Sequence, residues 1–281
     1  MSTGPARPAV ARAFRKVAEG YAAADFMHAE IASRLHAHLD LVTLQPATIL
    51  DLGAGPPAAT AALAARFPGA RLLAVDLVPE MLGREPQGWQ RLCADAARLP
   101  LPGQSVDLVV AGMLLHWCTD PAAVLAELRR VLRTPGLLLL STPGPDSLIE
   151  LRRAWRQADD LPHTLAFTEM HNLGDALIRA GFAEPVVDVE TLTVTYREAT
   201  RLVDDLRRVG ASDLGPERRR SLTAPGRWRA MLEALEAGRN ADGQLALTLE
   251  VIYAQAWTSD RFPLPGDGVE IPVERIRYRR R

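Results

Sequence analysis

The stretch "ILDLGAGPPAAT", residues 49–60, governs the prediction of the fold. An apolar run reaches Asp51, a Gly-Ala-Gly turn follows, and an alanine-rich segment continues after two prolines. A strand, a glycine turn and a helix in this order match the pattern G-x-G-x-x-G/A of dinucleotide-binding folds. We therefore expect an α/β protein with a ligand at the turn, and the two prolines bear on which ligand it is.

The proline pair argues against a phosphate-bearing ligand. A pyrophosphate at a helix N-terminus needs free backbone N–H donors, and Pro56 and Pro57 each remove one, although proline suits the first helical turn. Gly53 and Gly55 leave room for a ligand that approaches the backbone closely, and Asp51 favours a cationic group. S-adenosylmethionine, which has an ammonium and a sulfonium but no phosphate, meets these conditions, and NAD does not.

Two more acidic residues follow strand ends as a nucleoside site requires. Asp76 ends the second predicted strand, about 20 residues after Gly53, where an acidic side chain accepts hydrogen bonds from ribose hydroxyls. Asp95 follows the third predicted strand, where it can accept from an adenine amino group. A strand-end turn or a helix cap would explain any one of these acidic residues. The interpretation as a ligand site therefore depends on all three occurring at the ends of successive strands. The other expected cofactor contacts are Leu77, Met81, Ala96 and Trp117.

Strands alternate with helices over much of the first half of the chain, which predicts a Rossmann-like α/β fold. We expect a mostly parallel seven-stranded sheet with helices on both faces. The predicted strands are 47–52, 70–77, 89–95, 105–115, 136–142, 185–196 and 247–257, and the predicted helices are 9–45, 58–67, 79–85, 120–132 and 171–182. Polar helical stretches at 146–160, 197–210 and 226–238 follow strand ends, where an open α/β sheet keeps its ligand crevice, so we expect a helical lid there.

Composition narrows the functional class. The 281 residues carry a net charge of -1, which argues against general nucleic-acid binding. No apolar run reaches the ~18 residues needed to span a bilayer, and two cysteines are too few for a disulfide framework. We expect a soluble cytoplasmic protein without a nucleic-acid or membrane partner. We expect no metal site, because no carboxylate or cysteine pattern joins His163 and His171.

The strand-end residues resemble those of the class I S-adenosylmethionine-dependent methyltransferases. The matching residues are Asp51-Leu-Gly53-Ala-Gly55, Asp76 and Ala94-Asp95. More narrowly, the runs "GPDSLIELRRAW" (144–155) and "HNLGDALIRAGF" (171–182) resemble the malonyl-acyl-carrier-protein O-methyltransferases of biotin synthesis. The resemblance extends over about residues 9–257. It implies three parts: an N-terminal helical arm over 1–45, a methyltransferase domain over 46–257 with lid insertions near 146–170 and 197–240, and a C-terminal extension over 258–281.

The resemblance implies S-adenosylmethionine as the cofactor and a malonyl thioester, on an acyl-carrier protein or on coenzyme A, as the substrate. The methyl group goes to the free malonyl carboxylate, which needs no general base because an unperturbed carboxyl pKa is about 4. We expect Arg152 to hold that carboxylate through paired hydrogen bonds, Tyr21 to close over the cofactor, and His116 to lie where the reacting groups meet. The alternative for Arg152 is a solvated arginine, and the alternative for Tyr21 is a core tyrosine. For Trp117, expected to contact the cofactor, the alternative is a structural aromatic.

Acyl-carrier proteins are acidic, so a basic surface is expected to receive one. The candidate residues lie on two predicted lid helices and in the run "PERRRS" at 216–221; on the helices they are Arg152, Arg153, Arg156, Arg207 and Arg208. A solvated helix face would have the same composition.

The chain departs from the family pattern near the expected site. The family usually has a threonine and a glycine at Pro56-Pro57, an asparagine near Gly112, and an aspartate and a glutamine at Ala22 and His28. These departures leave two other hypotheses open. One is a methyltransferase-like protein with another substrate, such as the related factor that hydroxylates a protein arginine, and the other is a non-catalytic relative.

Overall fold

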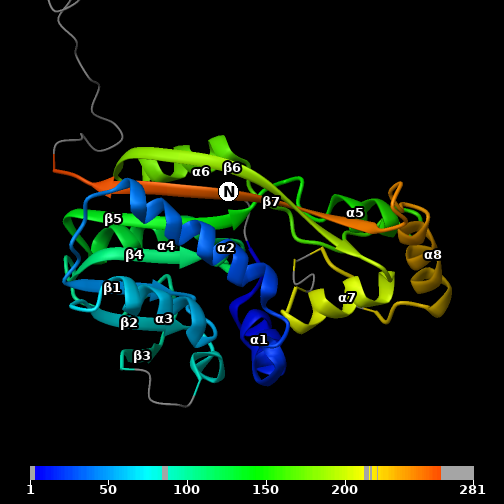
Figure 1. Cartoon of the computed structure of the whole chain (residues 1–281), viewed down its shortest axis with the longest axis horizontal. Helices are drawn as coiled ribbons and strands as arrows, with labels where there is room; N and C mark the ends of the chain where they lie inside the picture. Colours follow the sequence, from blue (N-terminus) through cyan, green and yellow to red (C-terminus); the bar gives the residue numbers. More distant parts are fainter. Residues whose placement is uncertain (1–3, 84–87, 212–214, 216, 220, 261–281) are drawn as a thin grey trace, which may run out of the picture.

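The computed structural model describes residues 4–83, 88–211, 215, 217–219 and 221–260, and these form one seven-stranded sheet (Figure 1). The strands are β1 (Thr48–Leu52), β2 (Arg71–Asp76), β3 (Gln90–Cys93), β4 (Val106–Gly112), β5 (Leu132–Pro143), β6 (Phe182–Tyr196) and β7 (Leu245–Thr258). Their order across the sheet is β3-β2-β1-β4-β5-β7-β6, and only β7 runs antiparallel to its neighbours. The predicted mostly parallel seven-stranded sheet is confirmed.

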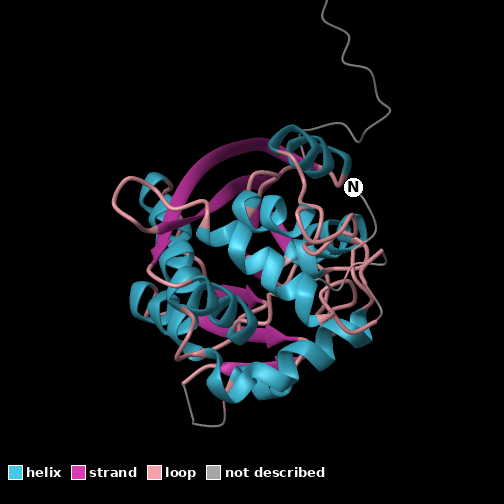
Figure 2. Cartoon of the chain, turned by 90° about the vertical axis from the view of Figure 1, so that its right-hand side faces the viewer, coloured by secondary structure: helices cyan, strands magenta, loops and turns pink. Residues whose placement is uncertain are grey.

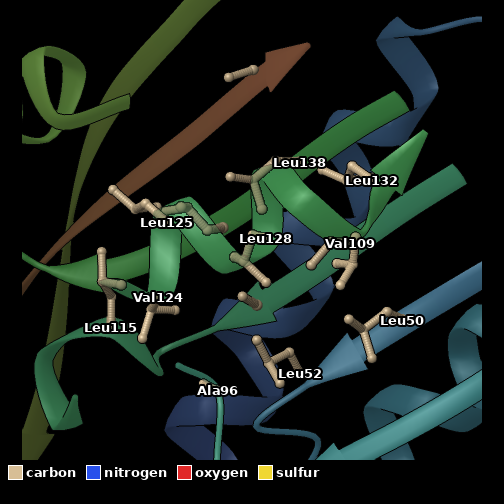
Figure 3. Packing of buried hydrophobic residues seen from close by; sticks show 14 of the residues in the cluster. Leu50, Leu52, Ala96, Val109, Leu115, Val124, Leu125, Leu128, Leu132 and Leu138 are labelled. Atoms are coloured by element: carbon tan, nitrogen blue, oxygen red, sulfur yellow. The ribbon is translucent and has the colours of Figure 1, made fainter. Parts of the chain in front are cut away.

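Helices cover both faces of the sheet, as predicted (Figure 2). Strand side chains alternate between the faces: Leu50 packs with α4 (Pro121–Val131) and α6 (Met170–Arg179), whereas Ile49 packs with α2 (Phe26–Ala37) and α3 (Pro57–Arg66). Figure 3 shows the first of these layers, in which Val124 and Leu128 of α4 lie in one cluster with Val109 and Leu52 of the strands. Asp120 caps the N-terminus of α4, because its side chain accepts the N–H groups of Ala122 and Ala123 in the first turn.

The strands β6 and β7 extend beyond the parallel sheet and carry a second body of helices (Figure 1). Its members, called the lid helices below, are α5 (Ile149–Arg156), α7 (Ala199–Arg208) and α8 (Pro225–Glu236). They occupy the three polar stretches in which the sequence predicts helices. Their own apolar core includes Leu151, Leu202, Met231 and Leu247, so the lid helices are held by packing that is separate from the sheet core.

The single helix predicted over 9–45 is wrong. The chain forms α1 (Arg7–Tyr21), a turn at 22–25, α2, and a 3-10 turn at His38–Leu41. The physical reason is that the two halves bury different surfaces. Tyr21 packs with Met81 beside the turn that follows β2, whereas Ile31 and Leu35 pack on the sheet, and one straight helix would not reach both.

Smaller differences concern element ends. Strand β5 begins at Leu132, earlier than predicted, and the helix predicted over 79–85 is a short 3-10 turn at Pro79–Leu82. Residues 84–85 of that prediction, residues 216 and 220 of the basic run and residues 261–281 of the C-terminal extension lie outside the described residues. Across the described part of the chain, no helix has the length and apolar character that a membrane crossing needs.

Candidate active site

A cavity of about 550 Å³ lies at the carboxyl ends of β1, β2 and β4, where parallel strands place the residues that follow them. All the cofactor residues predicted from sequence line it, as does Tyr21: Tyr21, Asp51, Gly53, Gly55, Asp76, Leu77, Met81, Asp95, Ala96 and Trp117. Its volume is within the range of about 300–1,000 Å³ that small-molecule sites occupy. We call it the first cavity.

Backbone conformation at the turn after β1 requires glycine. Gly53 has φ +70° and Gly55 has φ +57°, which is the left-handed region. A Cβ added at Gly53 would lie 2.9 Å from Cδ1 of Leu114, which is too close for a real contact. A side chain at position 53 would therefore displace Leu114, which also lines the first cavity.

The backbone donors of the same turn are already used. The N–H groups of Gly53 and Ala54 donate to the carbonyl of Val75, at 2.8 and 3.1 Å, and that of Gly55 donates to Asp76 at 3.1 Å. The next two residues are prolines and have no N–H. Positions 53–57 thus offer no free donor to a phosphate, which fits a ligand such as S-adenosylmethionine and disfavours NAD.

Two carboxylates, the buried Asp51 and the partly exposed Asp76, face the first cavity without an ion-pair partner among the described residues. Asp51 is 5% exposed and accepts a hydrogen bond of 2.6 Å from the hydroxyl of Thr60. Burial raises the pKa of Asp51 to about 6, against the effect of that hydrogen bond. Asp76 accepts from the N–H groups of Gly55 and Val78, and burial also raises its pKa. Among the described residues neither carboxylate forms an ion pair, so a cationic ligand with hydroxyl groups is complementary to both.

The third acid, Asp95, has a partner that the sequence does not reveal. Nη1 of Arg7, the first residue of α1, lies 2.5 Å from Oδ2 of Asp95. The chain before it is also fixed, because the N–H of Gly4 donates to the carbonyl of Thr119 and the Thr119 hydroxyl donates to the carbonyl of Pro5. The N-terminal segment therefore crosses the wall of the first cavity, and an adenine amino group would compete with Arg7 for Asp95.

A second cavity, of about 90 Å³, adjoins the first between the sheet and the lid helices. The two cavities share four lining residues: His28, Ile31, Met113 and Trp117. The wall of the second is mostly apolar and is assembled from α2, the segments after β4 and β5, the loop at 163–167, the segment 206–211 around the end of α7, and β7. A small group held in the second cavity would therefore meet a ligand of the first across these four residues.

The junction of the cavities gathers Tyr21, His28 and His116. Ring centroids of Tyr21 and His28 are 5.8 Å apart, and Nδ1 of His28 lies 3.1 Å from Oδ1 of Asp25. Burial, and then the charges of Asp25 and Asp76, raise the pKa of Tyr21 above its usual value, so its hydroxyl stays protonated. Sequence reasoning noted His28 only as a departure from the family, because nothing local reveals that α2 turns it toward this junction.

His116 lies in the second cavity and, like His28, has a buried ring nitrogen, Nδ1, that forms no hydrogen bond with the described residues. Burial, and to a smaller extent His28, lower the pKa of His116 to about 3, so the ring is neutral at physiological pH. Trp117 and Phe167 hold the ring, with centroids at 4.8 and 5.8 Å.

Arg152 does not line either cavity. Its Nη1 donates to the carbonyl of Ser147 at 2.7 Å, and its Nη2 donates to the carbonyl of Pro145. The guanidinium thus holds the loop before α5 in place. The expectation that Arg152 binds the substrate carboxylate gains no support from this geometry.

Other chemistry has little basis in the described residues. Burial, and then the nearby Asp95, raise the pKa of the Cys118 thiol to about 12, so no thiolate is available as a nucleophile. Within the described ranges, no group of three or more histidine, cysteine, aspartate or glutamate side chains is placed to hold a metal ion. His163 instead stacks on Trp155, at 3.7 Å between centroids, and lies 2.8 Å from Asp159.

The chain is similar in sequence to known methyltransferases. A family described as "Methyltransferase domain" matches residues 50–140. The malonyl-[acyl-carrier protein] O-methyltransferase of Gallionella capsiferriformans is 39% identical, with 89% of this chain and 90% of that protein covered. The protein of the same name from Laribacter hongkongensis is 40% identical, with 88% of each covered.

Solved structures show the same fold at low sequence identity. The YcgJ protein of Bacillus subtilis has a TM-score of 0.58 and 17% identity, over 81% of this chain and 99% of that one. A putative methyltransferase of Bacillus halodurans has a TM-score of 0.55 and 17% identity, over the same shares. The fold is therefore that of class I methyltransferases, and the level of identity to curated relatives shows that the chain belongs to the family of malonyl-[acyl-carrier protein] O-methyltransferases.

Proposed function

We propose that this chain transfers a methyl group from S-adenosylmethionine to the free carboxylate of malonyl-acyl-carrier protein, the reaction that its family relationship places in biotin synthesis. The observation that carries the proposal is the pair of adjoining cavities. The first presents the carboxylates of Asp51 and Asp76 and no free N–H at its glycine turn, and the second is small and mostly apolar. They meet at His28, Ile31, Met113 and Trp117, where the two ligands would react.

The cofactor would occupy the first cavity. Asp51 would receive its ammonium group, Asp76 its ribose hydroxyls, and Asp95 with Ala96 its adenine, while Leu77 and Met81 pack against the base. When bound, the cofactor supplies a methyl group on a sulfonium: an O–CH₃ bond forms as the S–CH₃ bond breaks, the electron pair stays on sulfur, and no proton moves.

The protein's contribution is alignment and the exclusion of water. Because the malonyl carboxylate is already ionised, the reaction needs no general base. Holding the reacting groups in line is worth about 7–11 kcal/mol of the barrier. The wall of the second cavity includes Met113, Phe167 and Leu249, which would strip water from the carboxylate. The lid helices would close this cavity over a short acyl group.

The outer surface of the lid helices supports a carrier-protein substrate. The exposed arginines of the lid helices are Arg153, Arg156, Arg201, Arg207, Arg208, Arg227 and Arg229. Arg207 stands over the ring of Trp228, at 4.7 Å from the centroid, which orders part of this surface. An acidic carrier protein would be steered to it, and the attraction would weaken with salt.

Mass spectrometry tests the proposal. The purified protein and S-adenosylmethionine should convert malonyl-acyl-carrier protein to its methyl ester and leave acetyl-acyl-carrier protein unchanged, because only the first has a free carboxylate. Malonyl-coenzyme A in a parallel reaction shows whether the carrier is required. S-adenosylhomocysteine, but not NAD, should raise the melting temperature. Stabilisation by S-adenosylhomocysteine without any ester product would refute the substrate and favour a methyltransferase-like protein with another substrate.

A further inference from the structure

The second cavity contains no full charge of its own. Among the described residues that line it there is no arginine, lysine, aspartate or glutamate. Its polar groups are three histidines and two hydroxyl residues: His28, His116, His163, Ser147 and Thr164. The described lining of this cavity thus offers hydrogen-bond donors to a carboxylate but no guanidinium or ammonium group. Arg152 does not line the cavity, and its guanidinium donates to the backbone carbonyls of Ser147 and Pro145.

Two histidines of this cavity, His28 and His116, have a buried Nδ1 atom without a hydrogen-bond partner among the described residues, but that of His28 lies 3.1 Å from Oδ1 of Asp25. His163 is held by Asp159, and His28 lies beside Asp25. Nδ1 of His116 is buried without a partner among the described residues. A buried polar atom without a hydrogen bond lowers the stability of the fold, and a ligand that supplies the hydrogen bond removes this cost. A neutral imidazole has one N–H donor, and the ring of His116 is held in place by Trp117 and Phe167.

A neutral donor suits methyl transfer from a sulfonium better than an arginine does. The reactants carry opposite charges, and both charges diminish in the transition state. A guanidinium would stabilise the full carboxylate of the reactants more than the partly neutralised transition state, and so would raise the barrier. A single N–H bond to one carboxylate oxygen positions the other oxygen while stabilising the reactants less.

We propose, on the basis of the function proposed above, that His116 holds the malonyl carboxylate through a ring N–H, with the cofactor's sulfonium as the only full positive charge beside it. The malonyl group then binds well only after S-adenosylmethionine. Once the methyl group has moved, both products are neutral at the reacting atoms, and the ester loses its electrostatic attachment. The order of binding and of release thus follows from the charge-free wall of the second cavity.

The first test measures affinity and needs no turnover. Calorimetry measures the affinity of malonyl-coenzyme A for two complexes of the protein. One is saturated with sinefungin, which has an ammonium in place of the sulfonium, and the other with S-adenosylhomocysteine, whose sulfur is uncharged. The sinefungin complex should bind malonyl-coenzyme A about tenfold more tightly, because the opposite charges lie close together in a poorly hydrated site. Acetyl-coenzyme A should show no such difference. Equal affinities of malonyl-coenzyme A for the two complexes would overturn the proposal.

The second test changes the donor. His116→Phe keeps a flat ring but removes the N–H, and kcat/KM for the malonyl substrate should fall about 10- to 100-fold. S-adenosylhomocysteine affinity should stay within about twofold, since His116 does not line the first cavity. His116→Gln, which restores a donor, should recover part of the loss. His171→Phe, an exposed histidine on α6, is the matched control.

The outcomes separate the two proposals. If the wild-type protein forms methyl ester but His116→Phe reacts normally, or if His116→Gln is no better than His116→Phe, the role of His116 is refuted and the proposed function stands. If no malonyl thioester is methylated by the wild type, the proposed function fails, and the affinity comparison still decides whether the second cavity depends on a neighbouring cation. A loss of S-adenosylhomocysteine affinity in His116→Phe would indicate a structural role instead.

Discussion

The two cavities differ in how the chain builds them. The three acidic residues of the first that we expect to bind the cofactor, Asp51, Asp76 and Asp95, lie at or just after the ends of β1, β2 and β3, so a few short motifs place them. The second is assembled from segments between Met27 and Leu249 that only tertiary packing brings together, and its ionisable groups are imidazoles. From this difference we infer a division of labour under the proposed function: the strand ends would bind the cofactor, and the packing of the lid helices against α2 would shape the substrate site.

The largest expected effect is at the glycine turn of the first cavity. Gly53→Val places a β-branched residue at φ +70° and a Cβ 2.9 Å from Leu114, so S-adenosylhomocysteine affinity should fall by about 100-fold. Gly69→Ala is the control, because its added Cβ meets nothing within 4 Å. Calorimetry measures both. Normal affinity in Gly53→Val would break the assignment of the first cavity to the cofactor.

A change in the core of the lid helices should affect the second cavity alone. Met231 is fully buried there, and Met231→Ala should cost about 2–5 kcal/mol of local stability. Hydrogen exchange in α5, α7 and α8 should rise and malonyl turnover should fall, while S-adenosylhomocysteine affinity stays within about twofold. Leu222→Ala, at a 96% exposed position, should change neither property. An equal loss of cofactor affinity in Met231→Ala would contradict the division of labour.

A smaller effect is expected at the ribose position. Asp76→Ala removes the acceptor of two backbone N–H groups and of the proposed ribose hydroxyls, so S-adenosylhomocysteine affinity should fall about tenfold. Asp188→Ala, an exposed aspartate of β6, is the matched control. If Asp76→Ala binds as the wild type does, Asp76 does not contact the cofactor.

The smallest effect is a pH dependence confined to the first cavity. The pKa of Asp51 rises from 3.8 to about 6 on burial, so the folded protein binds this proton more tightly than the unfolded chain. Asp51 therefore favours folding below about pH 4, and this contribution is lost as the pH rises to about 6. An ammonium ligand needs the ionised form, so S-adenosylhomocysteine affinity should fall a few-fold from pH 7 to pH 5.

The variant Asp51→Asn provides the comparison for that prediction. It should weaken binding at pH 7 and flatten the dependence between pH 5 and pH 7, because the titrating group is gone. The difference in unfolding free energy between the variant and the wild type should also change across this range. An unchanged pH dependence in Asp51→Asn would assign the titration to another group.

The sequence predicts the features of the structure that are determined by residues close together along the chain. The alternation of strands and helices gives the sheet, and Gly53, Asp51 and Asp76 are recognisable because each occupies a fixed place at a strand end. The break between α1 and α2 is not recognisable, since both halves have helical periodicity and only their different burial separates them. The ion pair of Arg7 with Asp95 joins residues far apart in the sequence, so no spacing predicts it.

The sequence suggests Arg152 as the residue that holds the carboxylate, whereas we propose His116 from the structure, and the reason for this difference is similar. Arg152 is in a run that resembles the family closely, and its charge makes it the obvious partner of a carboxylate. Whether its guanidinium reaches the site depends on the loop before α5, where the carbonyls of Pro145 and Ser147 hold it. His116 was predicted to lie near the reacting groups, but its unpaired Nδ1 is visible only once the surrounding side chains are placed.

The most direct test of the account is a crystal structure of the protein with sinefungin and a malonyl thioester of pantetheine. The account predicts the nucleoside in the first cavity, between Asp76 and Asp95, and the malonyl carboxylate in the second, within hydrogen-bond distance of His116. A carboxylate bound by Arg152, or a nucleoside outside the first cavity, would contradict it.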